Sequence, residues 1–253
     1  MIGIDLGSRS IKIVQMTGDS IVHHAVYDTI TFYRKYGSTA KGSLKINFDE
    51  LGFEQDQLVA TGYGKIAVQV EGAVHIPEIQ AHVRGAVFQS ALDDFTLLDI
   101  GGQDTKVVLV RDAREVDFMT NDRCAASSGR YMENMAAVLG ISLDELSSYS
   151  EEAVELSSTC AIFGETEIIA RIVEGNTTAS LAAGVNYALY KRFSTMLRKL
   201  SSKIIVLSGG GAMNSALQLI ISRETGREVY RLAEPQLNGA IGSCIFGSNM
   251  VHE

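Results

Sequence analysis

A short motif occurs twice in this chain, with a constant offset of 94 positions. "DLGSRSIKIV" begins at Asp5 and "DIGGQDTKVV" begins at Asp99, and both read Asp, aliphatic, Gly, small, three residues, Lys, aliphatic, Val. Each copy follows a short apolar run and leads into a second β-rich run. This pattern predicts a strand, a glycine turn and a second strand in each place. Two such units in a constant frame predict a duplicated α/β protein.

The chemistry of these turns suits a phosphate group. A glycine turn exposes backbone N–H donors and lets an anion approach closely, and Asp5 and Asp99 are carboxylates that can hold Mg²⁺ through water. In a phosphate turn, Gln103 can orient the water that attacks the phosphate. A pair of ordinary glycine hairpins is the alternative that each motif leaves open by itself. The candidate nucleotide-binding residues of the two turns are Asp5, Gly7, Ser8, Arg9, Ser10, Ile11, Lys12, Asp99, Gly101 and Gly102.

A third glycine-rich element, "KIIVLSGGGAMNSALQLI", begins at Lys203. A buried strand is predicted to lead through Gly210 and Gly211 into a helix with Met213, Leu217 and Ile220 on one apolar face. A strand, a glycine turn and a helix N-terminus together form a nucleotide site. The element has neither the GxGxxG spacing of a dinucleotide fold nor the GK[ST] of a P-loop, so a tight α/β connection is the alternative interpretation.

The remaining patterns alternate between strand and helix. Strands are expected at Gln57–Thr61 and Glu228–Arg231, a long helix at Thr178–Leu200, and a closing helix after Asn238. Alternation of this kind predicts an α/β protein with a nucleotide in the cleft between its halves.

Two of the three cysteines stand in similar places. Cys124 in "NDRCAASSGRYMENMAAVLG" and Cys160 in "SSTCAIFGETEIIARIVEG" each precede a helical pattern. A helix N-terminus favours a thiolate, because it carries partial positive charge and unsatisfied N–H groups. Small buried residues near helix starts are the alternative. Cys244 is expected to be a packed core residue of the last helix.

The composition excludes several classes of protein. The net charge of −8 argues against a nucleic-acid partner and against an anionic membrane surface. No apolar run approaches the ~18 residues of a membrane span, and Asp5 interrupts the first apolar stretch, so neither a membrane segment nor a signal peptide is expected. Three cysteines do not form a disulfide framework, and a cytoplasmic protein with reduced thiols is therefore expected.

These motifs carry a resemblance. The Asp-aliphatic-Gly turns of both halves and the late Gly-Gly-Gly-Ala resemble the superfamily of acetate kinase, sugar kinases, Hsp70 and actin. "ATGYGK" (Ala60–Lys65), "DIGGQD" and the two cysteine contexts are similar to the activator ATPases of 2-hydroxyacyl-CoA dehydratases and benzoyl-CoA reductases. The resemblance implies a duplicated actin-like ATPase fold. Its first half would be residues 1–92 joined by the C-terminal helix 236–253, and its second half would be residues 93–235.

The resemblance also implies a cofactor and partners. Two thiolates do not complete an iron–sulfur cluster, which normally takes four. Cys124 and Cys160 from both chains of a homodimer would supply four ligands to one bridging [4Fe–4S] cluster. Mg²⁺ and ATP or ADP would occupy the cleft, with Gly210 and Gly211 lining the adenosine and Gln236 closing the pocket. A ferredoxin or flavodoxin would donate the electron, and a larger iron–sulfur protein of the dehydratase, benzoyl-CoA reductase or double-cubane type would accept it.

Two other functions stay open at this point. One is a small-molecule kinase of the same superfamily in which the cysteines are incidental. The other is a nucleotide-dependent interaction protein, similar to actin or Hsp70, without redox chemistry. His82 in "PEIQAHVRG" is expected to be a surface or interface residue of a helix, in preference to a ligand or a base.

Overall fold

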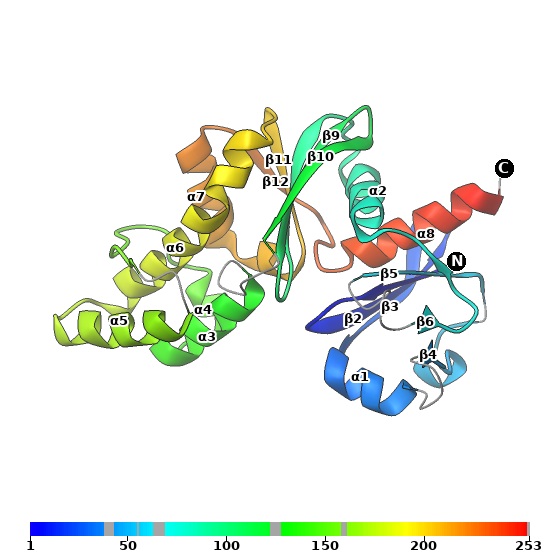
Figure 1. The fold of residues 1–253 in the computed structure, drawn as a ribbon, viewed down its shortest axis with the longest axis horizontal. Coiled ribbons are helices and arrows are strands. Elements are labelled where there is room, and N and C mark those ends of the chain that lie inside the picture. Colours follow the sequence, from blue (N-terminus) through cyan, green and yellow to red (C-terminus); the bar gives the residue numbers. More distant parts are fainter. Residues whose placement is uncertain (38–42, 55, 63–68, 122–127, 158–160, 252–253) are drawn as a thin grey trace. The chain divides into compact units, whose positions relative to one another are not determined.

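The structure is a computed structural model that describes residues 1–253 except 38–42, 55, 63–68, 122–127, 158–160 and 252–253 (Figure 1). The contacts between Cα atoms divide the chain into two compact units. The first unit contains Met1–Asp93, Val110–Glu115 and Leu232–Glu253, and the second contains Asp94–Leu109 and Val116–Arg231. The two halves expected from the sequence, with boundaries at 92 and 236, stay a prediction.

The first unit is built around a sheet with the strand order β3-β2-β1-β5-β7. Strands β1, β2 and β3 pair in antiparallel fashion, whereas β5 runs parallel to β1 and β7 runs parallel to β5. Its sheet strands are β1 (Ile2–Leu6), β2 (Ser10–Thr17), β3 (Ser20–Asp28), β5 (Leu58–Thr61) and β7 (Val74–His75). Its other elements are α1 (Thr29–Tyr36), β4 (Ser43–Leu44), the 3-10 helix η1 (Asp49–Leu51), β6 (Gln69–Val70), α2 (Glu78–Ser90) and α8 (Asn238–Val251).

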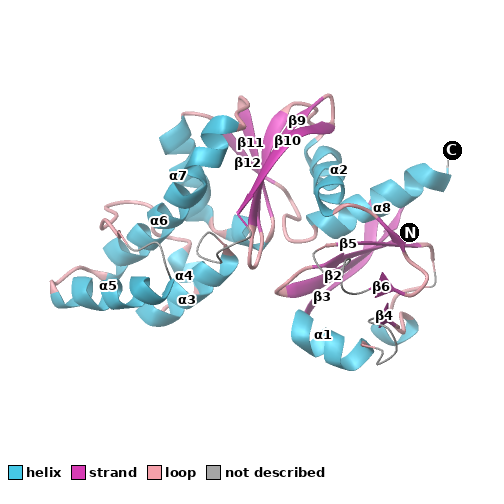
Figure 2. Ribbon diagram, viewed as in Figure 1, coloured by secondary structure: helices cyan, strands magenta, loops and turns pink. Residues whose placement is uncertain are grey.

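The sheet of the second unit has the corresponding order, β10-β9-β8-β11-β12. Strand β11 runs parallel to both β8 and β12. The strands are β8 (Phe95–Ile100), β9 (Thr105–Arg111), β10 (Arg114–Asn121), β11 (Ile204–Ser208) and β12 (Glu228–Arg231). The helices of this unit are α3 (Gly129–Leu139), α4 (Leu143–Leu146), α5 (Ala161–Val173), α6 (Thr178–Lys199) and α7 (Ser215–Thr225), with the 3-10 helix η4 (Gly210–Met213) before α7. Figure 2 shows α5 away from the strands, where it contacts α3 and α6.

The duplication predicted from the two Asp-Gly motifs is therefore present in the sheets. In each sheet the strand in which the motif begins, β1 or β8, is central, and it is flanked by the strand in which the motif ends and by a later strand. The predicted strand at residues 57–61 and the predicted strand Glu228–Arg231 are confirmed as β5 and β12.

Helix α6 confirms the longest helical prediction and contributes to the core of the second unit. Its apolar side chains at intervals of four are buried, as a helix with one core-facing stripe requires. These residues are Leu181, Val185, Leu189, Phe193 and Leu197. Val185, Leu189, Phe193 and Leu197 belong to one core together with side chains of α3, α7 and β11.

In the first unit, helices α2 and α8 pack side by side (Figure 1). Glycines make this close approach possible. A Cβ on Gly242 would lie 1.7 Å from the carbonyl oxygen of Ala81, and a Cβ on Gly85 would lie 2.2 Å from the carbonyl oxygen of Asn238. No real Cβ tolerates such distances, so only glycine fits at either position.

One detail of the sequence prediction is wrong. Met213 does not share an apolar helix face with Leu217 and Ile220, because it lies in η4 and is 57% exposed, whereas the other two are buried. The helical phase is interrupted at Asn214, whose side chain accepts a hydrogen bond from the backbone N–H of Leu217 and so begins a new helix.

Helix α5 begins directly after Cys160, as its pattern predicts. Ile168 is buried, but Ile169, Ile172 and Val173 are 58%, 49% and 83% exposed. The helix therefore presents apolar side chains outside the core of its own unit. Among the described helices of the chain, none combines the length and the apolar character that a bilayer span requires.

Candidate nucleotide site

The first glycine turn connects β1 to β2 and carries a buried ion pair. Lys12 Nζ lies 3.2 Å from Asp5 Oδ2, and the side chains are 14% and 4% exposed. The antiparallel register of β1 and β2 places Asp5 directly opposite Lys12. The lysine of the motif therefore lies across the strand pair from the aspartate with which the motif begins. Their spacing in the sequence is the one that this pairing requires.

Neighbouring elements fix the shape of this turn. The hydroxyl of Thr29 donates to the carbonyl oxygen of Gly7 at 2.7 Å, and a Cβ on Gly7 would lie 2.7 Å from Lys12 Nζ. Arg9 Nη1 lies 2.8 Å from Asp28 Oδ2 in an exposed ion pair. Hydrogen bonds from Thr31 lower the pKa of the Asp28 carboxyl, so this group is ionised beside Arg9 at neutral pH.

The other predicted residues of this turn differ in exposure. Ser8 and Ser10 are half-buried, Arg9 is exposed, and Ile11 is fully buried in the core beneath the sheet. Only the backbone of Ile11 is consequently available near the turn.

The second turn, between β8 and β9, repeats the carboxylate but surrounds it differently. Ser208 Oγ donates to Asp99 Oδ1 at 2.9 Å in a buried hydrogen bond. Lys106 Nζ lies 3.9 Å from Asp99 Oδ2 and 2.6 Å from Asp104 Oδ2, so this lysine pairs more closely with the second aspartate of the motif.

The hydrogen bonding of the two carboxylates differs because of the hydroxyl residue on the neighbouring strand. Thr61 on β5 stands opposite Asp5, as Ser208 on β11 stands opposite Asp99. The hydroxyl of Thr61, however, donates to the carbonyl oxygen of Ile76 at 3.1 Å. As a result, Asp5 Oδ1 is buried and accepts no hydrogen bond from the described residues.

A buried carboxylate oxygen without a donor is costly unless water or a cation satisfies it. Carboxylate oxygen is also the ligand type that Mg²⁺ prefers, commonly with several waters retained. Asp5 Oδ1 therefore fits a water-bound Mg²⁺, whereas Asp99 Oδ1 already accepts the Ser208 hydroxyl. Sequence alone does not reveal this difference, since both motifs begin with Asp.

The loop of the second motif is attached to the start of helix α3. Gly129 N donates to the carbonyl oxygen of Gly101 at 2.9 Å, and Ser128 Oγ donates to that of Gly102 at 3.0 Å. Gln103 directly follows Gly102, inside the turn that Gly101 N closes by donating to the carbonyl oxygen of Asp104 at 2.9 Å, and it is exposed. An exposed amide on a loop that is fixed on both sides can reach a bound water without reorganising the turn.

The two predicted glycines of the third element, Gly210 and Gly211, have different surroundings. A Cβ on Gly211 would lie 2.3 Å from Ile100 Cγ2, so this residue packs against the end of β8, whereas Gly210 faces open space. Gln236 is half-buried two residues before α8 and belongs to the first unit. The structure thus brings Asp5, Gly7 and Lys12 together in one unit, and Asp99, Gly101 and Gly211 in the other.

Cys124 and Cys160 lie outside the described residues. The helices that they are predicted to precede are present, because α3 begins at Gly129 and α5 begins at Ala161. Cys244 is fully buried in α8, and this burial raises its pKa to about 12. Such a thiol is neutral and packed, as the sequence predicts. The described part of the chain contains no cluster of three or more His, Cys, Asp or Glu arranged for a metal ion.

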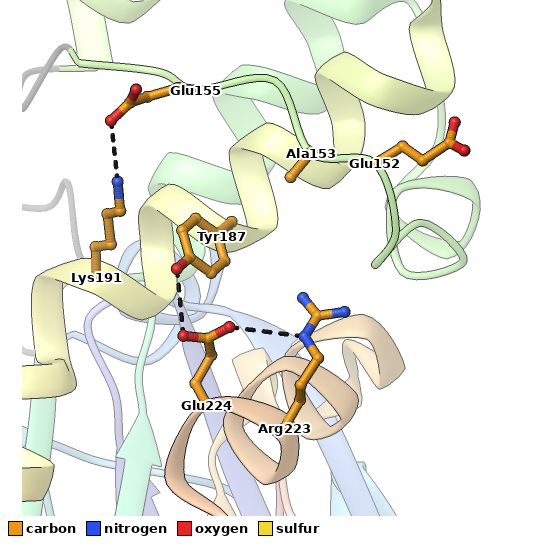
Figure 3. A pocket seen from close by; sticks show the side chains of 7 residues that line it. All are labelled: Glu152, Ala153, Glu155, Tyr187, Lys191, Arg223 and Glu224. Atoms are coloured by element: carbon orange, nitrogen blue, oxygen red, sulfur yellow. Dashed lines mark hydrogen bonds and ion pairs between the residues drawn. The ribbon is translucent and has the colours of Figure 1, made fainter.

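A pocket of about 480 Å³ lies in the second unit, on α6, α7 and the segment before α5 (Figure 3). Its lining residues are Glu152, Ala153, Glu155, Tyr187, Lys191, Arg223 and Glu224. Lys191 pairs with Glu155 at 3.4 Å, and Arg223 pairs with Glu224 at 3.6 Å. None of the predicted nucleotide residues lines it, so we do not connect this pocket with the phosphate turns.

Sequence reasoning missed Thr61, Ser208 and Thr29, which hold or flank the two turns. A signal was available for the first two. Each stands at the end of a buried strand and directly before a glycine of positive φ, Gly62 or Gly209. Thr29 has no comparable signal, because its contact with Gly7 spans 22 positions.

Comparison with known proteins defines the class and then the family. A solved structure of the activator of 2-hydroxyisocaproyl-CoA dehydratase from Clostridium difficile with bound ADPNP superposes with a TM-score of 0.86 at 29% identity, covering 100% of this chain and 95% of that one. MreB 5 of Spiroplasma citri bound to AMPPNP superposes with a TM-score of 0.60 at 12% identity, covering 99% and 96%, a likeness of fold alone. The chain therefore has the duplicated actin-like ATPase fold, as the sequence predicts.

The sequence profile of the BadF/BadG/BcrA/BcrD ATPase family matches residues 2–247. The 2-hydroxyisocaproyl-CoA dehydratase activator of Clostridioides difficile is 31% identical over 99% of this chain and 96% of its own length. The chain belongs to the BadF/BadG/BcrA/BcrD ATPase family, and the resemblance read from the motifs is confirmed.

Proposed function

We propose that this chain is an ATP-dependent activator that passes a low-potential electron to an iron–sulfur partner enzyme. The observation that carries the proposal is the family match over residues 2–247, with relatives named as dehydratase activators. The partner would be a 2-hydroxyacyl-CoA dehydratase, a benzoyl-CoA reductase or a double-cubane protein. A ferredoxin or flavodoxin would supply the electron.

The nucleotide part of the proposal rests on the two turns. Ser8 to Lys12 bind the phosphates through backbone N–H groups and the Lys12 ammonium. Asp5 Oδ1, which accepts no hydrogen bond from the described residues, would accept one from a water on Mg²⁺. Exposed Gln103 orients the attacking water, while Gly210 and Gln236 line the adenosine.

The redox part rests on the cysteines and on a homodimer. Cys124 and Cys160 of each chain would hold one [4Fe–4S] cluster, which supplies a transferable electron when it is bound. Cys244 is unsuited to this task, because its thiol is buried and its pKa is raised. Helices α3 and α5 begin after the two cysteines, and their N-termini favour thiolates.

The exposed face of α5 supports a protein interface. Ile169, Ile172 and Val173 follow Cys160 within one helix and are about half or more exposed. Apolar patches of this kind mark interaction sites. A second copy of the chain at this helix would cover them and would bring the two sets of cysteines to one place.

The coupling to ATP has an energetic reason. Lowering the effective potential of one electron by about 200 mV costs roughly 4.6 kcal/mol, since 59 mV corresponds to tenfold for one electron. Nucleotide binding and hydrolysis would supply this energy by driving the dimer between conformations that present the cluster differently.

The test is the fate of the γ-phosphate in anaerobically purified protein. We expect release of inorganic phosphate to water, with no transfer to any member of a panel of sugars, short carboxylic acids and alcohols. Lys12→Ala should lose nucleotide binding. Stoichiometric phosphorylation of a small molecule would establish the kinase alternative and refute the activator.

A further inference from the structure

His82 lies beside the carboxylate of the first turn. This side chain is buried in α2, with 6% of its surface exposed, so the expected surface position is wrong. Asp5 is 3% exposed. A Cβ on Gly239 would lie 2.9 Å from His82 Nε2 and 3.1 Å from Asp5 Oδ2. The imidazole edge and the carboxylate oxygen therefore border the same small gap above the backbone of Gly239.

The start of α8 fixes this arrangement. Asn238 Nδ2 donates to the carbonyl oxygen of His82 at 2.9 Å, and Gln89 Nε2 donates to Asn238 Oδ1 at 3.0 Å. The backbone of His82 is thus attached to the helix whose second residue is Gly239. Since Gly239 has no side chain, Nε2 can approach the carboxylate, and any larger residue would enter the gap.

The two oxygens of Asp5 have different surroundings. Oδ2 faces Lys12 Nζ at 3.2 Å and the gap that His82 borders, whereas Oδ1 accepts no hydrogen bond from the described residues. In the second turn, Asp99 is instead fixed by the Ser208 hydroxyl on its Oδ1. Among the described residues the first turn has no such hydroxyl contact, and the groups beside its carboxylate are the Lys12 ammonium and, across the gap at Gly239, the His82 imidazole.

We propose that His82 is a positioning residue for Asp5. Together with Lys12 it fixes Oδ2, so that Oδ1 stays directed toward the water shell of Mg²⁺ at the nucleotide. This inference rests on the proposed nucleotide site, and it assigns His82 neither a metal bond nor a proton transfer. Its specific consequence is that His82 contributes to the gain in nucleotide affinity that Mg²⁺ provides, and not to the affinity for the metal-free nucleotide.

The experiment is isothermal titration of ADP with Mg²⁺ and with EDTA, in variants that separate the two ring nitrogens. In His82→Gln the amide nitrogen approximates the position of Nε2, whereas in His82→Asn it approximates that of Nδ1. His82→Leu removes both, and His24→Gln, at an exposed histidine of β3, is the matched control. Thermal melting of each variant checks folding.

We expect His82→Leu and His82→Asn to reduce the Mg²⁺-dependent gain in ADP affinity roughly tenfold or more, the order of magnitude that a polar contact with a charged group contributes. His82→Gln should retain most of the gain, and His24→Gln all of it. Metal-free affinity should change by less than about twofold in every variant. If His82→Leu does not fold, the Gln and Asn variants decide the question.

The outcomes distinguish the two levels of the proposal. A normal gain in wild type and in all His82 variants, or an equal loss in the Gln and Asn variants, overturns the positioning role alone. Wild-type protein that binds no ADP, or gains nothing from Mg²⁺, overturns the nucleotide site and this inference with it.

Discussion

Removing Lys12 should lower the free energy of unfolding, because the buried carboxylate of Asp5 would lose the cation that neutralises it. The two charged atoms are 3.2 Å apart, and Asp5 is almost fully covered. Breaking a buried pair by deleting one partner costs about 3–5 kcal/mol, because the remaining charge is uncompensated. Lys12 is 14% exposed, so we expect Lys12→Met to lower the free energy of unfolding by about 3 kcal/mol, the low end of that range.

The matched control neutralises both partners. In Asp5→Asn/Lys12→Met no charge remains buried, and replacing a buried pair by neutral groups of similar volume is commonly neutral. We therefore expect the double variant to unfold within about 1 kcal/mol of the wild type, while nucleotide binding stays lost.

Urea unfolding in EDTA, followed by far-UV circular dichroism, measures the effect, since the chain has no tryptophan for fluorescence. A loss of about 3 kcal/mol lowers the urea midpoint by roughly 1 M or more. Equal stability of Lys12→Met and wild type, or a double variant no more stable than the single one, would refute this reasoning.

Three further predictions concern the catalytic and redox residues. Gln103→Ala should slow ATP hydrolysis by tenfold or more with ADP affinity unchanged, because the side chain is exposed on a turn fixed by other residues; stopped-flow phosphate release measures this, and wild-type turnover would count against the role. Cys124→Ser and Cys160→Ser should each lose most of the iron while Cys244→Ser keeps it, as measured by iron assay and EPR of anaerobic preparations; full iron in Cys124→Ser would contradict the ligand set. Because burial raises the pKa of Cys244 to about 12, its thiol should resist iodoacetamide at pH 8 until the chain is unfolded, and rapid labelling of this residue in the native protein, detected by peptide mass, would show that it is not packed.

The sequence predicts the parts of this fold that depend on local periodicity. The repeated Asp-Gly motif indicates two similar sheets, because each short copy contains the end of one strand, the glycine turn and the start of the next strand. Helix α6 follows from apolar residues at intervals of four, all of which are buried. The predicted core position of Cys244 is likewise confirmed by its full burial.

The contacts that distinguish the two turns are not predictable in this way. The Thr61 hydroxyl takes Ile76 as its partner, whereas the Ser208 hydroxyl takes Asp99, and the choice depends on the tertiary packing beside each strand. The gap between His82 and Asp5 depends on Gly239, which is more than 150 positions from His82 along the chain. The exposure of Ile169 and Val173 could not be predicted either, because the helical pattern identifies these residues only as apolar and does not show whether they are buried.

The most direct measurement of the central claim is the content of iron and acid-labile sulfide per dimer in anaerobically purified protein, with the mass of the particle determined on the same sample. A cluster bridging two chains through Cys124 and Cys160 predicts about four iron and four sulfide atoms per dimer, and a brown solution. A colourless protein without iron, or a monomer that carries a complete cluster, would contradict the account.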